Sequence, residues 1–226
     1  MKKFLLLPFL LLPLSLLFAQ GSGKNLTFNG SSSYVNCGTI NLNGSAVTLQ
    51  GWVYVSSFKT GHPYISSLWG TETNGNQCML RLGDGGLAAE KVQFVLYNGS
   101  THYKLDGSKS LTVNQWYHIA GTYDGTTMRI YINGKLDASR TQTMTIRSNS
   151  TFEIGRAYAH SRILDGKIDE VSVFKAALSQ NTIRDWMCQS INSSHPNYNQ
   201  LEDTGNWMME REPLPQTTQV KTIRVL

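Results

Sequence analysis

The fold is decided by residues 116–135, WYHIAGTYDGTTMRIYINGK, where apolar and polar residues alternate on both sides of two turn dipeptides. The dipeptides are Asp124-Gly125 and Asn133-Gly134. A tight reverse turn needs positive φ angles, which Asn, Asp and Gly tolerate best. The stretch therefore predicts antiparallel strands joined by two β-hairpins.

The same pattern extends in both directions along the chain, where Gly, Asn or Asp separates most of the short alternating runs. Because side chains on a strand alternate between its faces, residues 47–55 predict a strand with Val47, Leu49, Gly51, Val53 and Val55 on one face and Thr48, Gln50, Trp52 and Tyr54 on the other. Further runs lie at residues 64–69, 78–82, 92–97, 116–123, 128–132, 152–154 and 168–174. Short strands with irregular connections predict an all-β, two-sheet antiparallel β-sandwich of the jelly-roll kind rather than a barrel.

One segment near the C-terminus has helical periodicity. Ser179 can cap a helix that runs to Ser190, and Ile183, Trp186 and Met187 lie three and four residues apart. We expect this single short helix to pack its apolar stripe onto the edge of the sandwich.

The N-terminus differs from the rest of the chain. Two lysines precede an almost wholly apolar run, residues 4–18, and the small residue Ala19 follows, which predicts a secretory signal peptide over residues 1–19. The run is interrupted by prolines, and its length of about fifteen residues falls short of the roughly twenty that a bilayer helix needs. We expect export to the periplasm, cell surface or medium, with no membrane insertion after cleavage. Residues 20–200 are long enough for one domain with its own core.

Charge and cysteine usage exclude several classes of function. The chain holds 20 Lys and Arg against 15 Asp and Glu, and its basic residues are scattered singly, so nucleic acid is not an expected partner. The three cysteines, Cys37, Cys78 and Cys188, lie too far apart for a C-x-x-C site and predict either one disulfide or buried small apolar residues. The five histidines show no close metal-binding spacing, and His118 is expected to be a packing residue.

Three segments resemble a known family. Residues 116–135 are similar to the central hairpins of laminin-G-like domains of the concanavalin-A-like lectin and glucanase superfamily. Residues 165–179 resemble the closing strand and helix entry of these domains, and residues 26–35 resemble their first two strands. The resemblance implies a concanavalin-A-like sandwich. It leaves the function open, since this architecture carries lectins, adhesion modules, pentraxin-like proteins and accessory domains of glycosidases.

The resemblance also implies a calcium site at the rim of the sandwich. Family members often hold one Ca²⁺ near the first and last strands with carboxylate and carbonyl oxygens, and Asp169 and Asn29 are the candidate metal ligands here. Asn29 stands where the family often has Asp, so the ligand set would have one charge fewer. Asp169 interrupts an apolar strand, where a carboxylate must be hydrogen-bonded, paired or metal-bound. The alternative is a structural carboxylate that caps loop amides.

No catalytic residues are expected. Asp169 and Glu170 are adjacent, and because neighbours on a strand point to opposite faces, they should not flank one glycosidic bond. Glucanases of the related fold place acids at alternate strand positions, roughly Glu-x-Asp-x-x-Glu, and no segment of this sequence has that pattern. A nucleophile elbow and a phosphate-binding loop are also missing from it.

Carbohydrate binding needs an aromatic surface together with side chains that bond sugar hydroxyls. Two pairs, Tyr97-Asn98 and His102-Tyr103, flank a predicted loop and are, with Arg81, the candidate carbohydrate contacts. Further candidates are Trp52, Tyr54 and Trp69 as platforms and Arg129 as a polar partner. The alternative for the strand tryptophans Trp52 and Trp116 is that they fill the core.

Residues 201–226 lose the alternation and predict a disordered tail. A second hypothesis rests on the genetic code. Because Trp and Met have single codons, residues 206–210, NWMME, read one nucleotide earlier encode LDDG, which resembles the start of a further laminin-G-like repeat. The tail would then be the product of a frameshift within the gene of a longer protein.

Together these features predict an exported, non-catalytic binding module that recognises carbohydrate or an extracellular protein with the assistance of calcium. The alternative is an accessory carbohydrate-binding domain severed from a larger glycoside hydrolase or a multidomain cell-surface adhesin.

Overall fold

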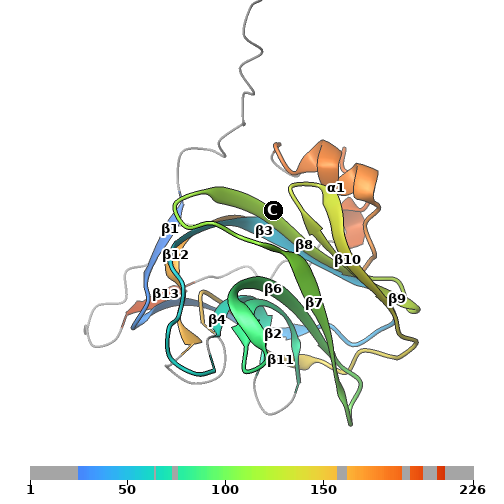
Figure 1. The fold of residues 1–226 in the computed structure, drawn as a ribbon. Coiled ribbons are helices and arrows are strands. Elements are labelled where there is room, and N and C mark those ends of the chain that lie inside the picture. The colour runs from blue at the N-terminus through green and yellow to red at the C-terminus, as the bar shows by residue number, and fades with distance from the viewer. Residues whose placement is uncertain are drawn as a thin grey trace, which may run out of the picture.

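The computed structural model describes residues 25–63, 65–72, 76–156, 162–189, 194–200 and 208–211. These residues form two antiparallel sheets stacked face to face, with a helix on the outside (Figure 1). The expected two-sheet sandwich with one short C-terminal helix is confirmed. The predicted signal peptide, residues 1–19, and most of the predicted tail lie outside the described residues. No helix in the described part of the chain is long and apolar enough to span a membrane.

The first sheet has six strands. Their order is β1 (Leu26–Asn29), β12 (Asp165–Phe174), β3 (Val47–Ser57), β8 (Trp116–Tyr123), β9 (Thr127–Ile132) and β10 (Lys135–Thr141). The second sheet has seven. Their order is β13 (Met208–Arg211), β2 (Ser33–Asn41), β11 (Asn149–Ile154), β4 (Ser66–Thr71), β5 (Cys78–Asp84), β6 (Leu87–Tyr97) and β7 (His102–Ser110).

The core lies between the inner faces of the two sheets. Val47, Leu49, Val53 and Val55 are fully buried there, so the predicted inner face of β3 is confirmed. Trp69 of β4 is also fully buried in this core, which removes it from the candidate binding platforms. Alternation in β3 therefore fixes which of its faces the sandwich encloses.

Both predicted hairpins are present. Asn133 and Gly134 adopt φ angles of 51° and 70° between β9 and β10, as a two-residue hairpin turn requires. Between β8 and β9, the Asp124 carboxylate accepts hydrogen bonds from the N–H groups of Thr126 at 2.9 Å and Thr127 at 2.8 Å. The side chain thus closes the second turn by the Asx mechanism.

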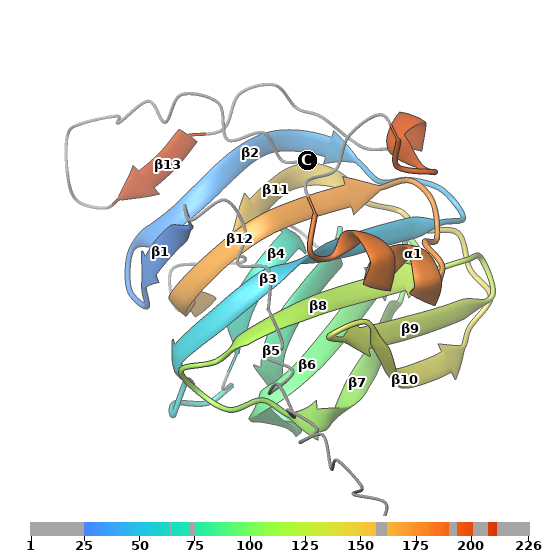
Figure 2. The ribbon, with the colours of Figure 1, turned by 90° about the horizontal axis from the view of Figure 1, so that it is seen from above.

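The helix α1 (Gln180–Trp186) begins at the predicted cap, where the N–H of Thr182 donates to Ser179 Oγ at 3.1 Å. It ends earlier than the periodicity suggests. Trp52 Nε1 donates to the carbonyl of Met187 at 2.7 Å, so this carbonyl serves the sheet instead of a longer helix. Figure 2 shows α1 lying across the outer face of the six-stranded sheet rather than at its edge. Ile183 packs there in a cluster with Ala120, Tyr131, Phe174 and Leu178.

The expectation that Trp52 and Trp116 fill the core is wrong. Both are half-buried and lie on the outer face of the six-stranded sheet, where Trp52 packs edge-on against His118 with ring centroids 5.4 Å apart. Trp116 packs against Tyr54 on the same face, at 5.7 Å. The reason is register, because both tryptophans alternate with residues that point inward. His118 is buried in this contact, as expected of a packing residue.

Candidate functional site

A polar cavity lined by described residues lies on the outer face of the seven-stranded sheet. Its volume is about 250 Å³. We call it the Arg81 cavity, and it is lined by Pro63, Ile65, Gln77, Arg81, Asp84, His102, Lys104 and Arg162. Arg81 points into it because its neighbours Leu80 and Leu82 face the core. Two of the five predicted carbohydrate contacts, Arg81 and His102, therefore lie in one hollow although they belong to different strands.

A buried ion-pair network holds Arg81 in place. Its Nε donates to Gln93 Oε1 at 2.8 Å, its Nη1 to Glu72 Oε1 at 3.3 Å and its Nη2 to Asp84 Oδ2 at 3.0 Å. Arg162 also pairs with Glu72, and Lys104 Nζ lies 2.5 Å from Asp84 Oδ2. The network joins β5, β6 and β7 to the segments around residues 72 and 162, and so fixes the guanidinium at the base of the cavity.

The pKa values of the two acids in this network, Glu72 and Asp84, are shifted in opposite directions. The Glu72 side chain is 0 % exposed, and burial raises its pKa against the opposing charges of Arg162 and Arg81. Burial alone would also raise the pKa of Asp84, but hydrogen bonds from Lys104 and from the N–H of Gly85, with the charge of Arg81, lower it to about 2. Asp84 is thus the firmly ionised acid at the cavity surface.

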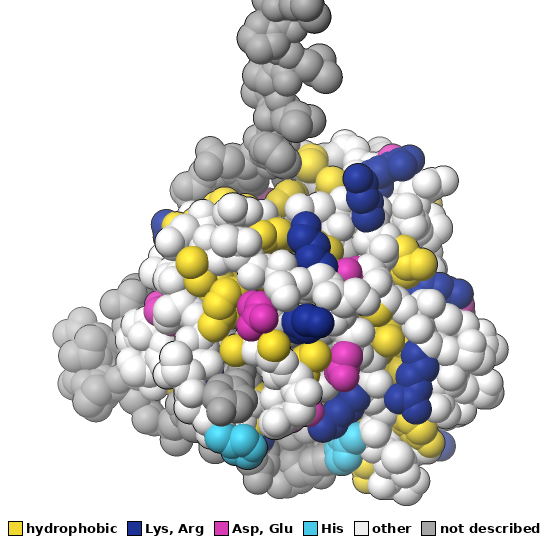
Figure 3. Space-filling view, in the orientation of Figure 1, with side chains coloured by type: hydrophobic (Ala, Val, Ile, Leu, Met, Phe, Trp, Pro, Cys, Tyr) yellow, Lys and Arg dark blue, Asp and Glu magenta, His cyan; other side chains and the backbone are white. Residues whose placement is uncertain are grey.

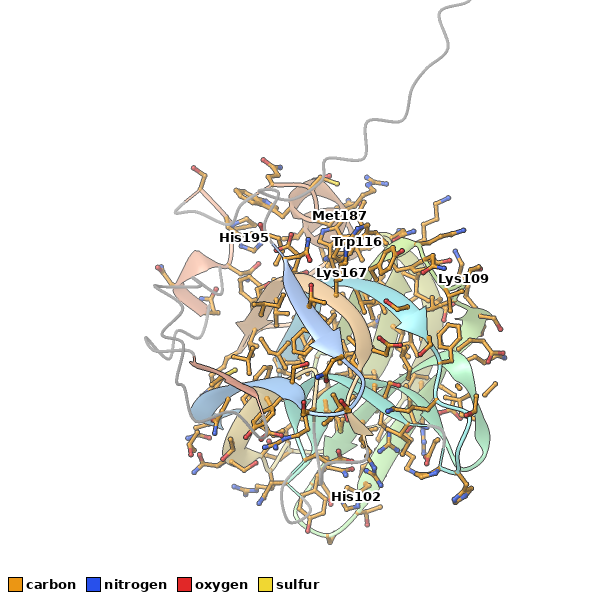
Figure 4. All side chains as sticks on the ribbon, turned by 90° about the vertical axis from the view of Figure 1, so that its left-hand side faces the viewer. His102, Lys109, Trp116, Lys167, Met187 and His195 are labelled. Atoms are coloured by element: carbon orange, nitrogen blue, oxygen red, sulfur yellow. The ribbon has the colours of Figure 1, made fainter. Side chains whose placement is uncertain are left out.

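An aromatic pair stands at the rim of the cavity. The rings of Tyr97 and His102 stack across the β6–β7 hairpin with centroids 4.6 Å apart and an interplanar angle of 28°. Tyr97 also donates its hydroxyl to the carbonyl of Gly99 at 2.6 Å. Figure 4 places His102 at the opposite end of the molecule from Trp116 and Lys167, so this aromatic pair is separate from the aromatic cluster on the other sheet.

The structure does not add Asn98 and Tyr103 to the cavity. The Asn98 amide oxygen accepts from the N–H groups of Ser100 at 2.9 Å and Thr101 at 2.8 Å, so it shapes the β6–β7 turn. Tyr103 packs on the core side of β7, with the guanidinium of Arg140 5.9 Å from its ring centre. Both residues support the hairpin that carries Tyr97 and His102.

Sequence reasoning missed Gln77, Asp84, Lys104 and Arg162. Lys104 lies at an exposed position of β7, a largely polar strand in which few apolar residues mark the alternation. Arg162 lies far along the chain from β5, and both Arg162 and Arg81 of β5 pair with Glu72. Polar residues on an outer sheet face leave no periodic signal, so the sequence could not group them. Figure 3 shows basic and acidic side chains interspersed on one face of the molecule, with no extended patch of one sign.

The two candidate calcium ligands lie apart. Asn29 pairs with Asp165, and Asp169 lies four residues further along β12, or about 13 Å at the rise of a strand. The Asn29 side-chain oxygen accepts from the N–H groups of Ser31, Ser32 and Ser33 at 2.8–3.1 Å. Lys59 Nζ donates to the carbonyl of Gly30 at 2.8 Å, which places an ammonium beside this loop. The residues present do not fit one ion held jointly by Asn29 and Asp169.

Asp169 Oδ1 accepts a hydrogen bond from the N–H of Glu170, the next residue of β12, at 2.9 Å. The regular strand alternation on which the predicted orientations of Asp169 and Glu170 depend is interrupted here. The register shifts between Asp169 and Ser172, and Glu170 has a φ of 51°, which marks a β-bulge. Both half-buried acids lie between the core residues Ile168 and Val171. Burial raises the pKa of both.

The three cysteines are free thiols. Two of them match the second prediction, that cysteines here serve as buried small apolar residues. Cys37 and Cys78 are buried in the core, whereas Cys188 is exposed. Burial raises the pKa of both core thiols. Neither is placed for chemistry at the Arg81 cavity.

Comparison with known proteins gives a consistent fold. A protein from Bacteroides ovatus ATCC 8483, described as a "putative carbohydrate binding protein", matches with a TM-score of 0.59 and 23 % identity over 83 % of this chain and 52 % of its own. This chain therefore spans about half the length of that protein. A SAP-like pentraxin from Limulus polyphemus matches with a TM-score of 0.57 and 14 % identity over 83 % and 94 % of the two chains.

A third structure is domain 4 of AbnA, a GH43 extracellular arabinanase from Geobacillus stearothermophilus, in complex with arabinotriose. It matches with a TM-score of 0.57 and 22 % identity over 76 % of this chain and 79 % of its own. At these identities the likeness shows the shared fold alone. A search of curated proteins found no match. The family model of the concanavalin A-like lectin/glucanases superfamily matches residues 29–184, and the chain belongs to that family.

Proposed function

We propose that this chain is an exported, non-catalytic module that binds carbohydrate in the Arg81 cavity. The observation that carries the proposal is the convergence of polar head groups beside a stacked aromatic pair. Arg81 and Lys104 supply donors and the Gln77 amide supplies both a donor and an acceptor for sugar hydroxyls, while Tyr97 and His102 supply an apolar face. Binding sites for small ligands combine such features in a concave surface.

The size of the cavity suits a single sugar residue. Its volume of about 250 Å³ lies below the roughly 300–1,000 Å³ typical of sites for drug-sized ligands. A longer glycan would enter with one residue and lie along the rim at His102. Fold likeness to an arabinanase domain solved with arabinotriose supports testing arabinan first.

The proposal that the module is non-catalytic rests on the two acids at the Arg81 cavity, Glu72 and Asp84. Glu72 is wholly buried, and Asp84 is held by Arg81 and Lys104, so neither is free to donate a proton to a leaving group. Export rests on the apolar N-terminal run and its preceding lysines. An accessory domain of a larger glycoside hydrolase would bind sugar in the same way.

A glycan array probed with the full chain, followed by calorimetric titration of the best ligand, tests the proposal. His102→Ala and Gln77→Ala should each weaken binding about tenfold, the loss of one good polar or stacking contact. Lys135→Ala is the matched control, because Lys135 is exposed on β10, outside the cavity. Loss of binding in the control as well, or unchanged binding in both cavity variants, would refute the assignment. Release of reducing ends from the same glycans would contradict the non-catalytic role.

A further inference from the structure

The Arg81 cavity carries more basic than acidic groups. Arg81, Lys104 and Arg162 line it, whereas Asp84 is the one acid among the described lining residues. Glu72 lies beneath with a side chain that is 0 % exposed, so it neutralises charge without reaching a ligand. Counting both acids, three positive groups face two negative ones. The cavity therefore has an excess of one positive charge, in a volume that suits one sugar residue.

The acids of the cavity offer a ligand few reachable acceptors, since Glu72 Oε2, which has no partner among the described residues, is buried. Glu72 Oε1 accepts from Arg81 at 3.3 Å, from Gln77 Nε2 at 3.2 Å and from Arg162. Asp84 Oδ2 accepts from Arg81 and Lys104, and its Oδ1 accepts from the N–H of Gly85 at 2.7 Å. A neutral sugar presents hydroxyls that donate as well as accept, and these acids are poorly placed to receive its donors.

The bases keep donors. Arg81 uses three of its five N–H groups, toward Gln93, Glu72 and Asp84, and Lys104 uses one of its three. Lys104 is the most reachable base, with 45 % of its side chain exposed. A group that only accepts, such as a carboxylate or sulfate, matches a surplus of donors and gains the added strength of charge-assisted hydrogen bonds.

We propose that the Arg81 cavity selects an anionic sugar, one that carries a carboxylate or a sulfate. Because Asp84 Oδ2 already lies between Arg81 and Lys104, the acidic group contacts the exposed ammonium of Lys104, and the sugar ring lies toward the Tyr97–His102 pair. The proposal rests on the carbohydrate-binding function and adds the class of ligand. Because the contact with Asp84 already restrains the Lys104 ammonium, less side-chain entropy is lost when the anion binds.

The test compares ligands that differ in charge alone. Oligogalacturonate and its methyl ester share one backbone, and a sulfated galactan and its desulfated form supply the second pair, which separates carboxylate from sulfate as the acidic group. Calorimetric titration of the full chain should give binding to one acidic form at least tenfold tighter than to its neutral partner. This affinity should fall as NaCl is raised.

Substitutions at Lys104 and Lys135 test whether the preference for acidic ligands arises in the Arg81 cavity. Lys104→Gln keeps the polarity of the side chain but removes the charge, and should weaken binding of the acidic ligand about tenfold more than it weakens binding of the neutral partner. Lys135→Gln is the control and should bind as the wild type does. Equal affinity for acidic and neutral forms would overturn the inference and leave carbohydrate binding standing. Full binding by Lys104→Gln would also overturn it, and a blank result with every glycan would refute the proposed function itself.

Discussion

The indole N–H of Trp52 donates to the carbonyl of Met187 at 2.7 Å, which ties β3 of the six-stranded sheet to the end of α1. The bond joins residues at opposite ends of the domain sequence. It also keeps the tryptophan on the outer face, where its ring contacts His118.

Replacing Trp52 by Phe should lower the free energy of unfolding by more than the same change at Trp116. Both rings are half-buried on one sheet face, so loss of area is similar, and the difference reports the hydrogen bond to Met187. We expect about 1 kcal/mol for that difference, measured by chemical denaturation. Equal effects of Trp52→Phe and Trp116→Phe would show that the hydrogen bond contributes nothing to stability.

Stability should fall as the pH drops from 7 to 5 because of His118. Burial lowers the pKa of His118 from 6.5 to about 3, and its Nδ1 has no partner in the described structure. Between pH 6.5 and about 3, the unfolded state therefore binds more protons at His118 than the folded state does. The stabilisation is complete above pH 6.5 and is lost as the pH falls toward 3.

Denaturation midpoints of the wild type and of His118→Gln, measured at intervals between pH 7.5 and 5, check this prediction. The wild type should lose about 2 kcal/mol over this range. The variant should start less stable and show a shallower slope. Parallel slopes would mean that another group causes the pH dependence.

Gly166→Ala should destabilise the sandwich strongly. A Cβ at Gly166 would lie 2.1 Å from the carbonyl oxygen of Tyr54, a backbone atom of the neighbouring strand that cannot move aside cheaply. We expect a loss of roughly 1–3 kcal/mol or failure to fold. Gly86→Ala is the control, since nothing lies within 4 Å of its Cβ position. Similar melting temperatures for the two variants would contradict the close approach of β12 and β3.

Calcium should leave the melting temperature unchanged. The Asn29 oxygen is occupied by three backbone N–H groups, and the Lys59 ammonium lies on the carbonyl of Gly30. Differential scanning fluorimetry with excess CaCl₂ and with EDTA should therefore give the same curve. A rise with calcium that Asp169→Asn abolishes would instead establish Asp169 as a ligand, as the family resemblance implies.

One thiol should react in the native protein and three after unfolding. Cys188 is exposed, whereas Cys37 and Cys78 are buried and burial raises the pKa of their thiols. Titration with an aromatic disulfide reagent before and after guanidinium addition measures both counts. Fewer than three thiols in denaturant would indicate a disulfide in the isolated protein.

Much of the fold follows from local features of the sequence. The Asn133-Gly134 turn, the inner face of β3 and the Ser179 cap each depend on a few neighbouring residues, whose φ preferences, alternation and capping oxygen act over one turn or one strand. These were predicted from the sequence, together with the two-sheet architecture.

Only the tertiary structure decided where the site lies. Arg81, Lys104 and Arg162 come from separate segments, and no periodic pattern links polar residues that face solvent on an outer sheet surface. Likewise, the bulge at Glu170 and the outward position of Trp52 depend on the register with neighbouring strands. The sequence by itself determined the inner face of β3 that the sandwich encloses, because burial along this strand follows local alternation. Strand pairing between distant segments decided which polar side chains meet outside the sandwich.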